Sequence, residues 1–316
     1  MKVLITGGSG LVGYAINSVY QNYNKQYNKS HDFIFLGSRD ADLRDYTQTR
    51  AIFAKHMPDA IIHLAAKVGG LFMNMNNKVQ MFEDNLMINY NVLRAAHDLN
   101  INNVISCLST CIFPDNTTYP IDETMLHNGA PHDSNDSYAY CKRMAEVHSK
   151  AYREQYNRNY FCVIPTNIYG PNDNYNLDDA HVIPALVHRC YICKQQGQPF
   201  VVKGSGKPLR QFIHSYDLAY LMLYVLDNYH DGTPIILAPD EADEMTIADV
   251  ANNIAKCFDY VHMMQFDNTS ADGQYKKTAN NAKLRKLLPN YAMIPFNDGI
   301  NESINWFEQN YTTLRK

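Results

Sequence analysis

Tyr138 and Lys142 are the two residues whose types and spacing most clearly suggest acid–base chemistry. They follow a run of helix-capping residues, 133–137, and their spacing of four places both on one face of the predicted helix. A tyrosine phenol has an ordinary pKa of about 10, and a neighbouring ammonium stabilises its phenolate. The pair can therefore exchange a proton with a substrate oxygen near neutral pH. The spacing excludes Tyr140 as the partner of Lys142.

A second set of reactive side chains follows an apolar run. Residues 104–108 are typical of a buried strand, and the next residues, STCIFP, place two hydroxyls and a thiol at its end. If the strand alternation persists, Ser109 and Cys111 point to one side and Thr110, on the other, is structural. Cys107 shares the side of Cys111, but we expect burial to keep it inert. Whether Cys111 packs or reacts stays open on these residues alone.

The N-terminal residues predict a phosphate loop. A strand-like run at 3–6 leads into a G-x-x-G-x-x-G motif that precedes a helical pattern. Such glycines allow a tight turn and bring backbone N–H groups to a pyrophosphate at the positive end of a helix. The residues expected to bind a dinucleotide there are Gly7, Gly8, Ser9, Gly10, Leu11, Val12 and Gly13.

The end of the second predicted strand bears on the choice of cofactor. Arg39 lies where the adenosine ribose would bind, and a guanidinium suits a 2′-phosphate. Asp40 follows directly, and a carboxylate there would suit a free 2′-hydroxyl. We favour NADPH over NADH.

Short apolar runs alternate with amphipathic stretches through the first half of the chain. The expected strands are 3–6, 33–36, 60–64, 104–108 and 160–164, and the expected helices are 12–20, 47–56, 85–99 and 137–156. This order predicts an α/β fold, a Rossmann-type doubly wound parallel sheet with a smaller C-terminal α/β substrate lobe. We expect residues 1–170, with segments near 207–235, to form the NADP-binding domain, and residues 171–316 to form mainly the substrate lobe.

Composition narrows the class of protein. The 316 residues carry a net charge of −4 and no basic stripe, so we expect no nucleic-acid partner. The chain starts directly in a strand-like run and has no long apolar helix, so we expect a cytoplasmic protein without a membrane partner. Seven irregularly placed cysteines suggest free thiols. The lone C-x-x-C of Cys190 and Cys193 favours ordinary helix residues over a redox or metal site, and we expect no metal.

The glycine loop, the strand-end hydroxyls and the Tyr-x-x-x-Lys pair together resemble the extended short-chain dehydrogenases/reductases, a family of mostly nucleotide-sugar enzymes. Within it, five blocks in matching order resemble the GDP-L-fucose synthases, which are 3,5-epimerases/4-reductases of GDP-4-keto-6-deoxy-D-mannose. The blocks are residues 63–70 (HLAAKVGG), 109–114 (STCIFP), 165–171 (PTNIYGP), 181–186 (HVIPAL) and 272–277 (DGQYKK).

The resemblance implies a bifunctional, NADPH-dependent enzyme that makes GDP-L-fucose. It implies that Cys111 and His181 transfer protons at C3 and C5 of the sugar, that Ser109 hydrogen-bonds O4, that Tyr138 protonates this oxygen and that Lys142 binds the nicotinamide ribose. It also implies that further residues line the cofactor: Ala65, Ala66, Pro165, Thr166, Asn167, Ile168 and His181. The residues implied to bind the nucleotide-sugar are Arg189, Lys203, Arg210 and Asp272.

One departure and several alternatives remain open at this point. Lys203 stands where the family typically has tryptophan, which leaves the nucleotide and sugar preference undecided. A homodimer through the helices near 85–99 and 137–156 is an expectation by analogy. The rivals are a 4-epimerase, a 4,6-dehydratase, a simple 4-reductase, a 4-reductase/epimerase of a different NDP-4-keto-6-deoxy sugar, and a non-catalytic binding protein of the same fold. Dehydratases typically carry an acidic pair where this chain has Cys111 and Ile112, and a binding protein typically has a broken Tyr-x-x-x-Lys.

Overall fold

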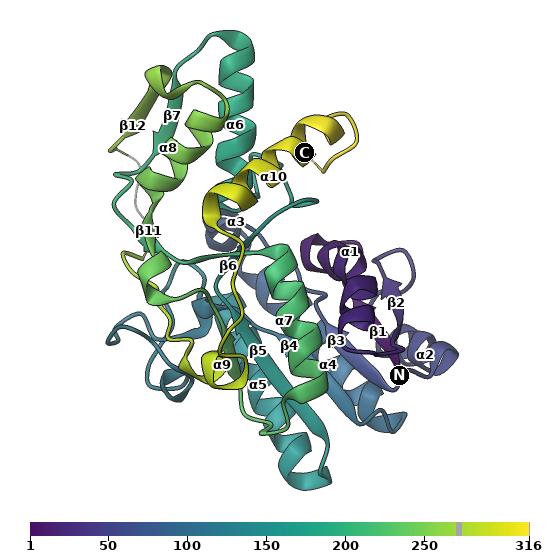
Figure 1. The fold of residues 1–316 in the computed structure, drawn as a ribbon. Helices are drawn as coiled ribbons and strands as arrows, with labels where there is room; N and C mark the ends of the chain where they lie inside the picture. The colour runs from purple at the N-terminus through teal and green to yellow at the C-terminus, as the bar shows by residue number, and fades with distance from the viewer. Residues whose placement is uncertain (270–273, 316) are drawn as a thin grey trace.

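Six parallel strands form the central sheet of the computed structural model, which describes residues 1–269 and 274–315 (Figure 1). Their order is β10-β5-β4-β3-β1-β2, and every neighbouring pair is parallel. The strands are β1 (Lys2–Thr6), β2 (Asp32–Leu36), β3 (Ala60–His63), β4 (Asn103–Cys107), β5 (Asn159–Pro165) and β10 (Ile235–Leu237). The chain reverses its direction of progress across the sheet between β2 and β3, so a crevice opens at the carboxyl end of β1, where doubly wound sheets bind ligands.

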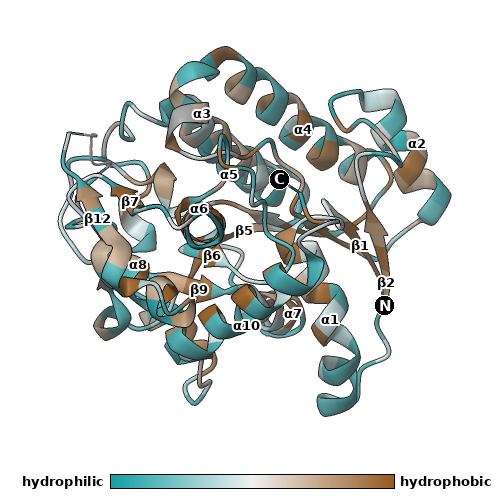
Figure 2. Cartoon of the chain, turned by 90° about the horizontal axis from the view of Figure 1, so that it is seen from above, coloured by the Kyte–Doolittle hydropathy of each residue, from teal (hydrophilic) through white to brown (hydrophobic). Residues whose placement is uncertain are grey.

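Helices cover both faces of this sheet, which explains why its inner strands are apolar on both sides. All four residues of β3, AIIH, are buried. On one face lie α1 (Leu11–Gln26) and α7 (Ser215–Asn228), and on the other lie α2 (Tyr46–His56), α4 (Lys78–Asp98) and α5 (Asp136–Tyr156). Seen from above, brown apolar strands lie between helices whose outer faces are teal (Figure 2). The predicted Rossmann-type fold is confirmed.

Local sequence signals set several helix ends. The Asp45 carboxylate accepts a hydrogen bond from Gln48 N and starts α2, and Asn157, with φ +54°, ends α5 in the left-handed conformation. α4 begins seven residues before the predicted helix, because residues 78–84 continue it without a side-chain cap at Asn77. The predicted and observed boundaries of α5 differ by one residue.

The remaining elements form a smaller lobe around a separate apolar cluster (Figure 1). Its main elements are α6 (Val182–Gln196), β7 (Phe200–Lys203), α8 (Ile247–Cys257), β12 (Met264–Asp267) and α10 (Phe296–Asn310). Short elements join it to the sheet: α3 (Leu71–Asn76), β6 (Asn167–Tyr169), β8 (Leu209–Arg210), β9 (Phe212–His214), β11 (Met245–Thr246) and α9 (Ala282–Leu287). The single-turn 3-10 helices are η1 (Thr110–Ile112), η2 (Glu123–Met125), η3 (Glu241–Asp243) and η4 (Val261–Met263).

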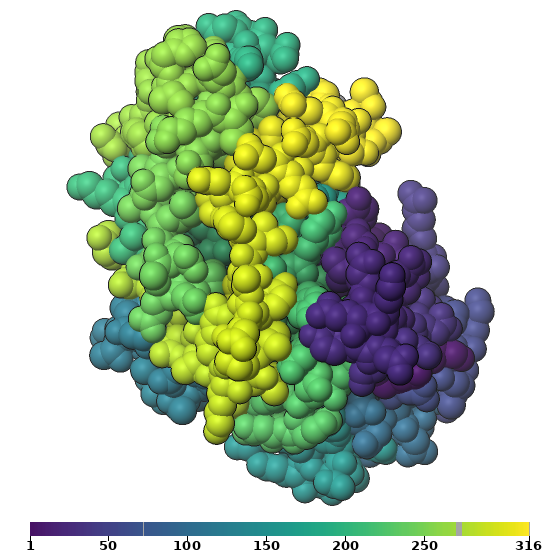
Figure 3. Space-filling model, viewed as in Figure 1, coloured from purple at the N-terminus to yellow at the C-terminus, as the bar shows by residue number. Residues whose placement is uncertain are grey.

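The C-terminal segment crosses between the two parts of the molecule. Figure 3 shows residues from α9 to α10, in yellow, running over the surface from the sheet region to the smaller lobe. Beneath it, the buried Gln211 amide bonds both the N–H and the carbonyl of Ala279. In the part of the chain that the structure describes, no helix is long and apolar enough to cross a membrane.

Candidate active site

The phosphate loop (residues 7–13) connects β1 to α1 and has the shape that a dinucleotide needs. Gly7 has φ +70°, and a Cβ there would lie 2.8 Å from the backbone N of Ala65. A Cβ on Gly13 would lie 2.4 Å from the carbonyl O of Gly8, so neither glycine tolerates a side chain. α1 then begins after Gly10 with no side-chain cap and no acidic residue in its first turn. Its first N–H groups are therefore suited to hold a pyrophosphate.

The other predicted cofactor residues follow the ends of neighbouring strands. Arg39 is exposed after β2, and Ala65 and Ala66 are half-buried after β3. Pro165 and Thr166 are buried at the end of β5, and Asn167 and Ile168 lie in β6. Among the described residues, Thr166 Oγ1 is a buried polar atom without a hydrogen-bond partner. The structure thus brings these residues to one edge of the sheet, beside the phosphate loop.

A buried hydrogen-bonded chain links this edge to the helix of Tyr138. Thr6 Oγ1 accepts the N–H groups of residues 64 and 65 and lies 2.8 Å from His63 Nδ1, so its proton goes to that nitrogen. His63 Nε2 lies 3.0 Å from Asn89 Oδ1, and Asn89 Nδ2 donates to Cys141 O. Burial lowers the pKa of His63 to about 3, so the ring stays neutral with its proton on Nε2. These hydrogen bonds connect β1, β3, α4 and α5.

Two more buried asparagines make α4 a support for several loops. Asn85 bonds both backbone groups of Lys67, at 2.9 Å to its N and 3.0 Å to its O. Asn91 Nδ2 donates to Leu43 O at 3.0 Å. With Asn89, one helix thereby holds the loops after β2 and β3 and the start of α5.

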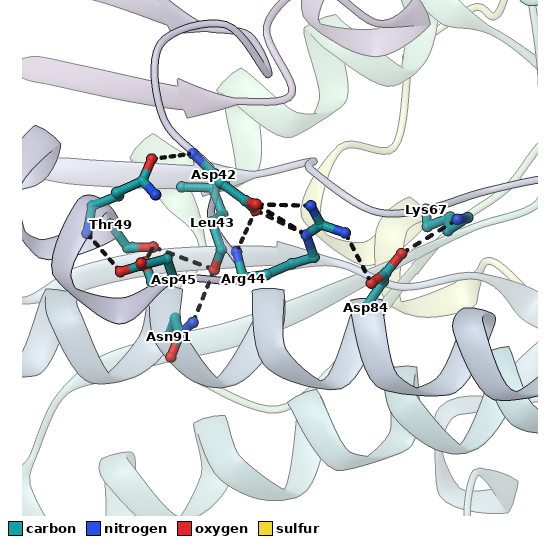
Figure 4. A network of polar contacts seen from close by, with 9 residues as sticks. Asp42, Leu43, Arg44, Asp45, Thr49, Lys67, Asp84 and Asn91 are labelled. Atoms are coloured by element: carbon teal, nitrogen blue, oxygen red, sulfur yellow. Dashed lines mark hydrogen bonds and ion pairs between the residues drawn. The ribbon is translucent and has the colours of Figure 1, made fainter.

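On the solvent side of these contacts lies a chain of charges (Figure 4). Arg44 contacts Asp42 at 2.8 Å and Asp84 at 3.2 Å, and Lys67 reaches Asp84 at 3.3 Å. Asp84 is the most buried of the four side chains, while half of the Arg44 side chain is exposed. Exposed pairs of this kind contribute little to stability because solvent screens them.

The thiol turn (residues 109–112) follows β4, which ends at Cys107, whereas the predicted alternation would require the strand to continue to Cys111. The prediction that Ser109 and Cys111 point to one side by strand alternation is wrong, because the chain enters the 3-10 turn η1. Ser109 Oγ caps this turn by accepting the N–H of Cys111 at 3.4 Å. The two side chains are close for this different reason. Thr110 is buried, as expected for a structural residue.

Tyr138 and Lys142 share one face of α5, as the spacing predicts. Lys142 Nζ lies 5.6 Å from the centre of the Tyr138 ring and donates to Cys107 O at 2.8 Å. Burial raises the pKa of Tyr138 well above its ordinary value and lowers that of Lys142. Tyr138 is therefore protonated at neutral pH. Burial therefore dominates the pKa of this phenol, against the expectation that Lys142 would stabilise the phenolate.

Cys111 and His181 approach the same region from different elements. His181 is the N-cap residue of α6; its side chain reaches solvent, yet the surrounding protein desolvates it and lowers its pKa. Burial raises the pKa of the half-buried Cys111, and the ammonium of Lys277 opposes this shift. Lys277 also lowers the pKa of His181, so this cation acts on both groups.

Lys277 is the residue of this site that spacing did not single out. Burial, followed by the charge of Arg210, lowers its pKa to about 8. The only sequence signal was its place at the end of the block 272–277, which gave it no role. It reaches the thiol because residues 278–280 run beside Ile121, which accepts the N–H of residue 280 and donates to the carbonyl of residue 278.

The predicted nucleotide-sugar residues lie in the smaller lobe and its connections. Arg189 is half-buried on α6, and burial lowers its pKa. Arg210 lies in β8 and donates to the carbonyls of Leu209 and Gln274 at 2.7 and 2.6 Å. Lys203 is exposed at the end of β7, and Asp272 lies outside the described residues.

The remaining thiols differ in their surroundings. Cys107 is half-buried rather than fully buried, and burial raises its pKa to about 11, so it is protonated as well as poorly exposed. Cys190 is buried on α6, and Cys193 is half-buried three residues later. In the described ranges, 1–269 and 274–315, no group of three or more metal-ligating side chains was found.

Comparison with known proteins identifies the family to which this chain belongs. Residues 3–237 match the model of the "NAD dependent epimerase/dehydratase family". The chain belongs to this family. It is 52% identical to a GDP-L-fucose synthase of Dictyostelium discoideum, over 99% of this chain and 97% of that protein, and 50% identical to a probable GDP-L-fucose synthase of Drosophila melanogaster, over 100% and 99%. The predicted likeness to this branch of the epimerase family is confirmed.

A solved relative from the epimerase family agrees in structure. A GDP-L-fucose synthetase from Naegleria fowleri, bound to NADP, superposes with a TM-score of 0.92 and is 43% identical, with 100% of this chain and 96% of that one covered. A UDP-glucose 4-epimerase from Thermotoga maritima, 16% identical, superposes with a TM-score of 0.82 and shows the shared fold alone.

Proposed function

We propose that the chain is an NADPH-dependent 3,5-epimerase/4-reductase that converts GDP-4-keto-6-deoxy-D-mannose to GDP-L-fucose. One observation carries the proposal: a phenol and ammonium pair, Tyr138 and Lys142, lies beside the thiol turn, and one cation, Lys277, shifts the pKa of both members of a second pair, the Cys111 thiol and the His181 imidazole. The first pair suits reduction of a carbonyl, and the second suits proton transfer beside it. The full-length identity to GDP-L-fucose synthases supports the same chemistry.

Epimerisation needs a proton removed from one face of a carbon and returned to the other. The C4 carbonyl acidifies the C–H bonds at C3 and C5, and in this proposal Ser109 donates a hydrogen bond to O4 as negative charge develops there. Cys111 and His181 serve as the two proton carriers. Because burial raises the thiol pKa and lowers the imidazole pKa, both enter the reaction uncharged at neutral pH. Each can then exchange a single proton with the sugar.

Reduction uses the other pair at the same carbonyl. Bound NADPH supplies a hydride to C4. Tyr138 gives its proton to O4, and its raised pKa keeps that proton available. Lys142, fixed to Cys107 O, places its charge beside the phenol and balances the phenolate that remains. Proton transfer from Tyr138 thus completes the alcohol without a separate acid.

The two halves of the molecule divide the ligands in this proposal. Residues 1–170, with segments near 207–235, bind the cofactor, and residues 171–316 contribute most of the substrate lobe. Arg189 and Arg210 suit the diphosphate because a guanidinium contacts two oxygens at once. Lys203 stands where the GDP-L-fucose synthases typically carry tryptophan. It offers a charge near the nucleotide instead of an aromatic face.

A homodimer through α4 and α5 is part of the proposal. The two helices pack against each other, and both expose large apolar side chains. Those between 38% and 69% exposed include Val79, Phe82, Tyr90, Tyr140, Met144 and Val147. Exposed apolar side chains gathered into one patch are typical of an interface. Sedimentation of a Met144→Arg variant beside the wild type tests it, and an unchanged sedimentation coefficient would remove this pair of helices from the interface.

A cytoplasmic location also belongs to the proposal. All seven cysteines are free, which suits a reducing compartment.

The deciding experiment compares 4-keto-6-deoxy sugars linked to GDP, UDP and dTDP. Each is mixed with the protein and NADPH, absorbance reports NADPH oxidation, and NMR reports the configuration at C3, C4 and C5. We expect oxidation with the GDP sugar and a product inverted at C3 and C5. Oxidation without inversion would leave a simple 4-reductase, and preference for another nucleotide would assign the chain to a sister activity.

A further inference from the structure

Arg143 is a buried cation that the reaction described above does not use. It follows Lys142 on α5, and only 5% of it is exposed. Its Nε donates to Ile112 O at 2.5 Å and its Nη1 to Gly129 O at 2.7 Å. Among the described residues its Nη2 is buried without a hydrogen-bond partner and no carboxylate forms an ion pair with it; its guanidinium carbon lies 5.6 Å from the centre of the Tyr140 ring. A buried guanidinium without a counter-charge is costly.

The carbonyl that Arg143 binds most closely belongs to the thiol turn. Ile112 is the last residue of η1, a single turn whose own bonds are long, with 3.2 Å from Ile112 N to Ser109 O. One such turn has little stability by itself. At the other end of the same stretch, Lys142 binds Cys107 O. Two successive residues of α5 thus fasten the two ends of the segment that carries Cys111.

The second carbonyl ties in the loop opposite. Gly129 lies in the segment whose next residue, Ala130, accepts the N–H of Asp115 at 2.9 Å. Arg143 therefore joins three pieces of chain, α5, the thiol turn and the 129–130 loop, through one side chain. A methionine would fill similar space without the cost of a buried charge, so packing alone does not account for an arginine here.

We propose that Arg143 is a positioning residue for epimerisation, which holds the Cys111 thiol in register with Tyr138 and Lys142 by fixing the thiol turn to α5. The inference rests on the proposed function, because it assigns a task within that reaction. When the Cys111 thiol ionises, the charge of the guanidinium attracts the thiolate and so acts in the same direction as the hydrogen bonds. Tyr138 and Lys142 are themselves residues of α5 and do not rely on Arg143 for their place in it, so we expect hydride transfer to be independent of Arg143.

The test separates the two half-reactions. Deuterium uptake from solvent at C3 and C5 of GDP-4-keto-6-deoxy-D-mannose measures epimerisation, and oxidation of GDP-L-fucose by NADP⁺ measures hydride transfer without epimerisation. For Arg143→Met we expect uptake to fall about 10- to 100-fold, as for a displaced catalytic group, while oxidation changes less than about threefold. Arg143→Lys keeps a donor for one carbonyl and should recover part of the uptake.

Arg153 provides a matched control on the same helix. Its Nη1 donates to a backbone carbonyl, Tyr160 O, at 2.8 Å, but at the far end of α5 from Tyr138. Arg153→Met should leave both rates unchanged. Equal loss of both rates in Arg143→Met, or loss of neither, would overturn the inference. If Arg143→Met does not fold, Arg143→Lys carries the test, and it must lose at least about threefold in uptake with oxidation intact. A wild type without uptake would instead overturn the proposed function.

Discussion

The phosphate loop and the thiol turn lie at the same edge of one sheet, yet they are held in different ways. The phosphate loop is fixed by backbone contacts: Gly8 N donates to Leu36 O of β2 at 2.7 Å, and the space beside Gly13 is filled by the Gly8 carbonyl. The thiol turn is fixed by side chains that come from 30 or more residues away, Lys142 and Arg143. We expect an added side-chain atom to disrupt the phosphate loop, and removal of the Lys142 or Arg143 side chain to disrupt the thiol turn.

This difference decides which loop tolerates change. A backbone-packed turn offers no alternative geometry, because the clashing atoms are carbonyls and N–H groups that cannot rotate away. A turn held by two long side chains can keep its backbone conformation when one of them is lost, but it is then held less firmly in position. We expect substitutions in the phosphate loop to affect folding and cofactor binding together, and substitutions around the thiol turn to affect one chemical step.

The largest effect should come from breaking the phosphate loop at Gly13. In Gly13→Val the Cβ would lie 2.4 Å from Gly8 O, so the start of α1 must move away from β1. We expect loss of measurable NADPH binding and a decrease of about 2–4 kcal/mol in the free energy of unfolding. Fluorescence titration and urea unfolding measure these. Gly10→Ala, whose Cβ would meet only Gly7 O at 3.3 Å, should cost less stability, and equal cost would contradict the steric account.

The next largest effect should come from the thiol turn and should be confined to one half-reaction. Cys111→Ser replaces a thiol by a hydroxyl that ionises far less readily, so deuterium uptake at C3 and C5 should fall about 10³-fold. NADP⁺ affinity should be unchanged. Tyr138→Phe should show the opposite pattern, with uptake retained and hydride transfer lost. Unchanged uptake in Cys111→Ser would reduce that cysteine to a packing residue.

The pKa values of Cys111 and His181 allow a test of which of the two removes the proton from the sugar. If Cys111 removes the proton, the uptake rate should rise with pH far above neutrality, because its raised pKa keeps the thiol protonated at pH 7. If His181 removes it, uptake should reach its plateau below neutrality, since its pKa is lowered. The pH profile of uptake therefore assigns the base.

An effect on stability, without loss of either half-reaction, concerns the loop that covers the phosphate loop, where Asn172 Nδ2 donates to Ser9 O at 3.2 Å. Burial raises the pKa of the neighbouring Asp173 from 3.8 to about 7. The folded state therefore binds a proton that the unfolded state releases, and stability falls between about pH 4 and pH 7 by up to about 4 kcal/mol. Asp173→Asn should remove this decline and be more stable than the wild type at pH 8 but not at pH 4. Parallel stability curves would contradict the assignment.

The smallest effect should come from the exposed charges of Figure 4. Arg44→Ala removes contacts to Asp42 and Asp84, but solvent surrounds the guanidinium. We expect the melting temperature to change little, and added salt to abolish the difference. A large change that persists in salt would show that this network supports the loops held by α4.

The parts of this protein that sequence reasoning predicted are those set by neighbouring residues. The strands, the phosphate loop and the Tyr138–Lys142 face of α5 follow from apolar runs, glycine spacing and helical periodicity. The path of the chain after Cys107 did not, because a hydroxyl cap at Ser109 turned an expected strand into a 3-10 turn. Lys277, whose charge acts on Cys111, and Arg143, which binds Ile112 O, come from distant segments. No local pattern encodes such contacts, since the topology alone brings these residues together.

The three buried asparagines of α4 have a consequence for protein engineering. Asn85, Asn89 and Asn91 bind the backbone of the loop after β3, the His63 ring and the loop after β2, all from one rigid helix. These loops are therefore not interchangeable modules. A cofactor-specificity loop transplanted from another enzyme would arrive without its amide anchors, and a graft that includes α4 as a unit is the smallest piece expected to carry the geometry across.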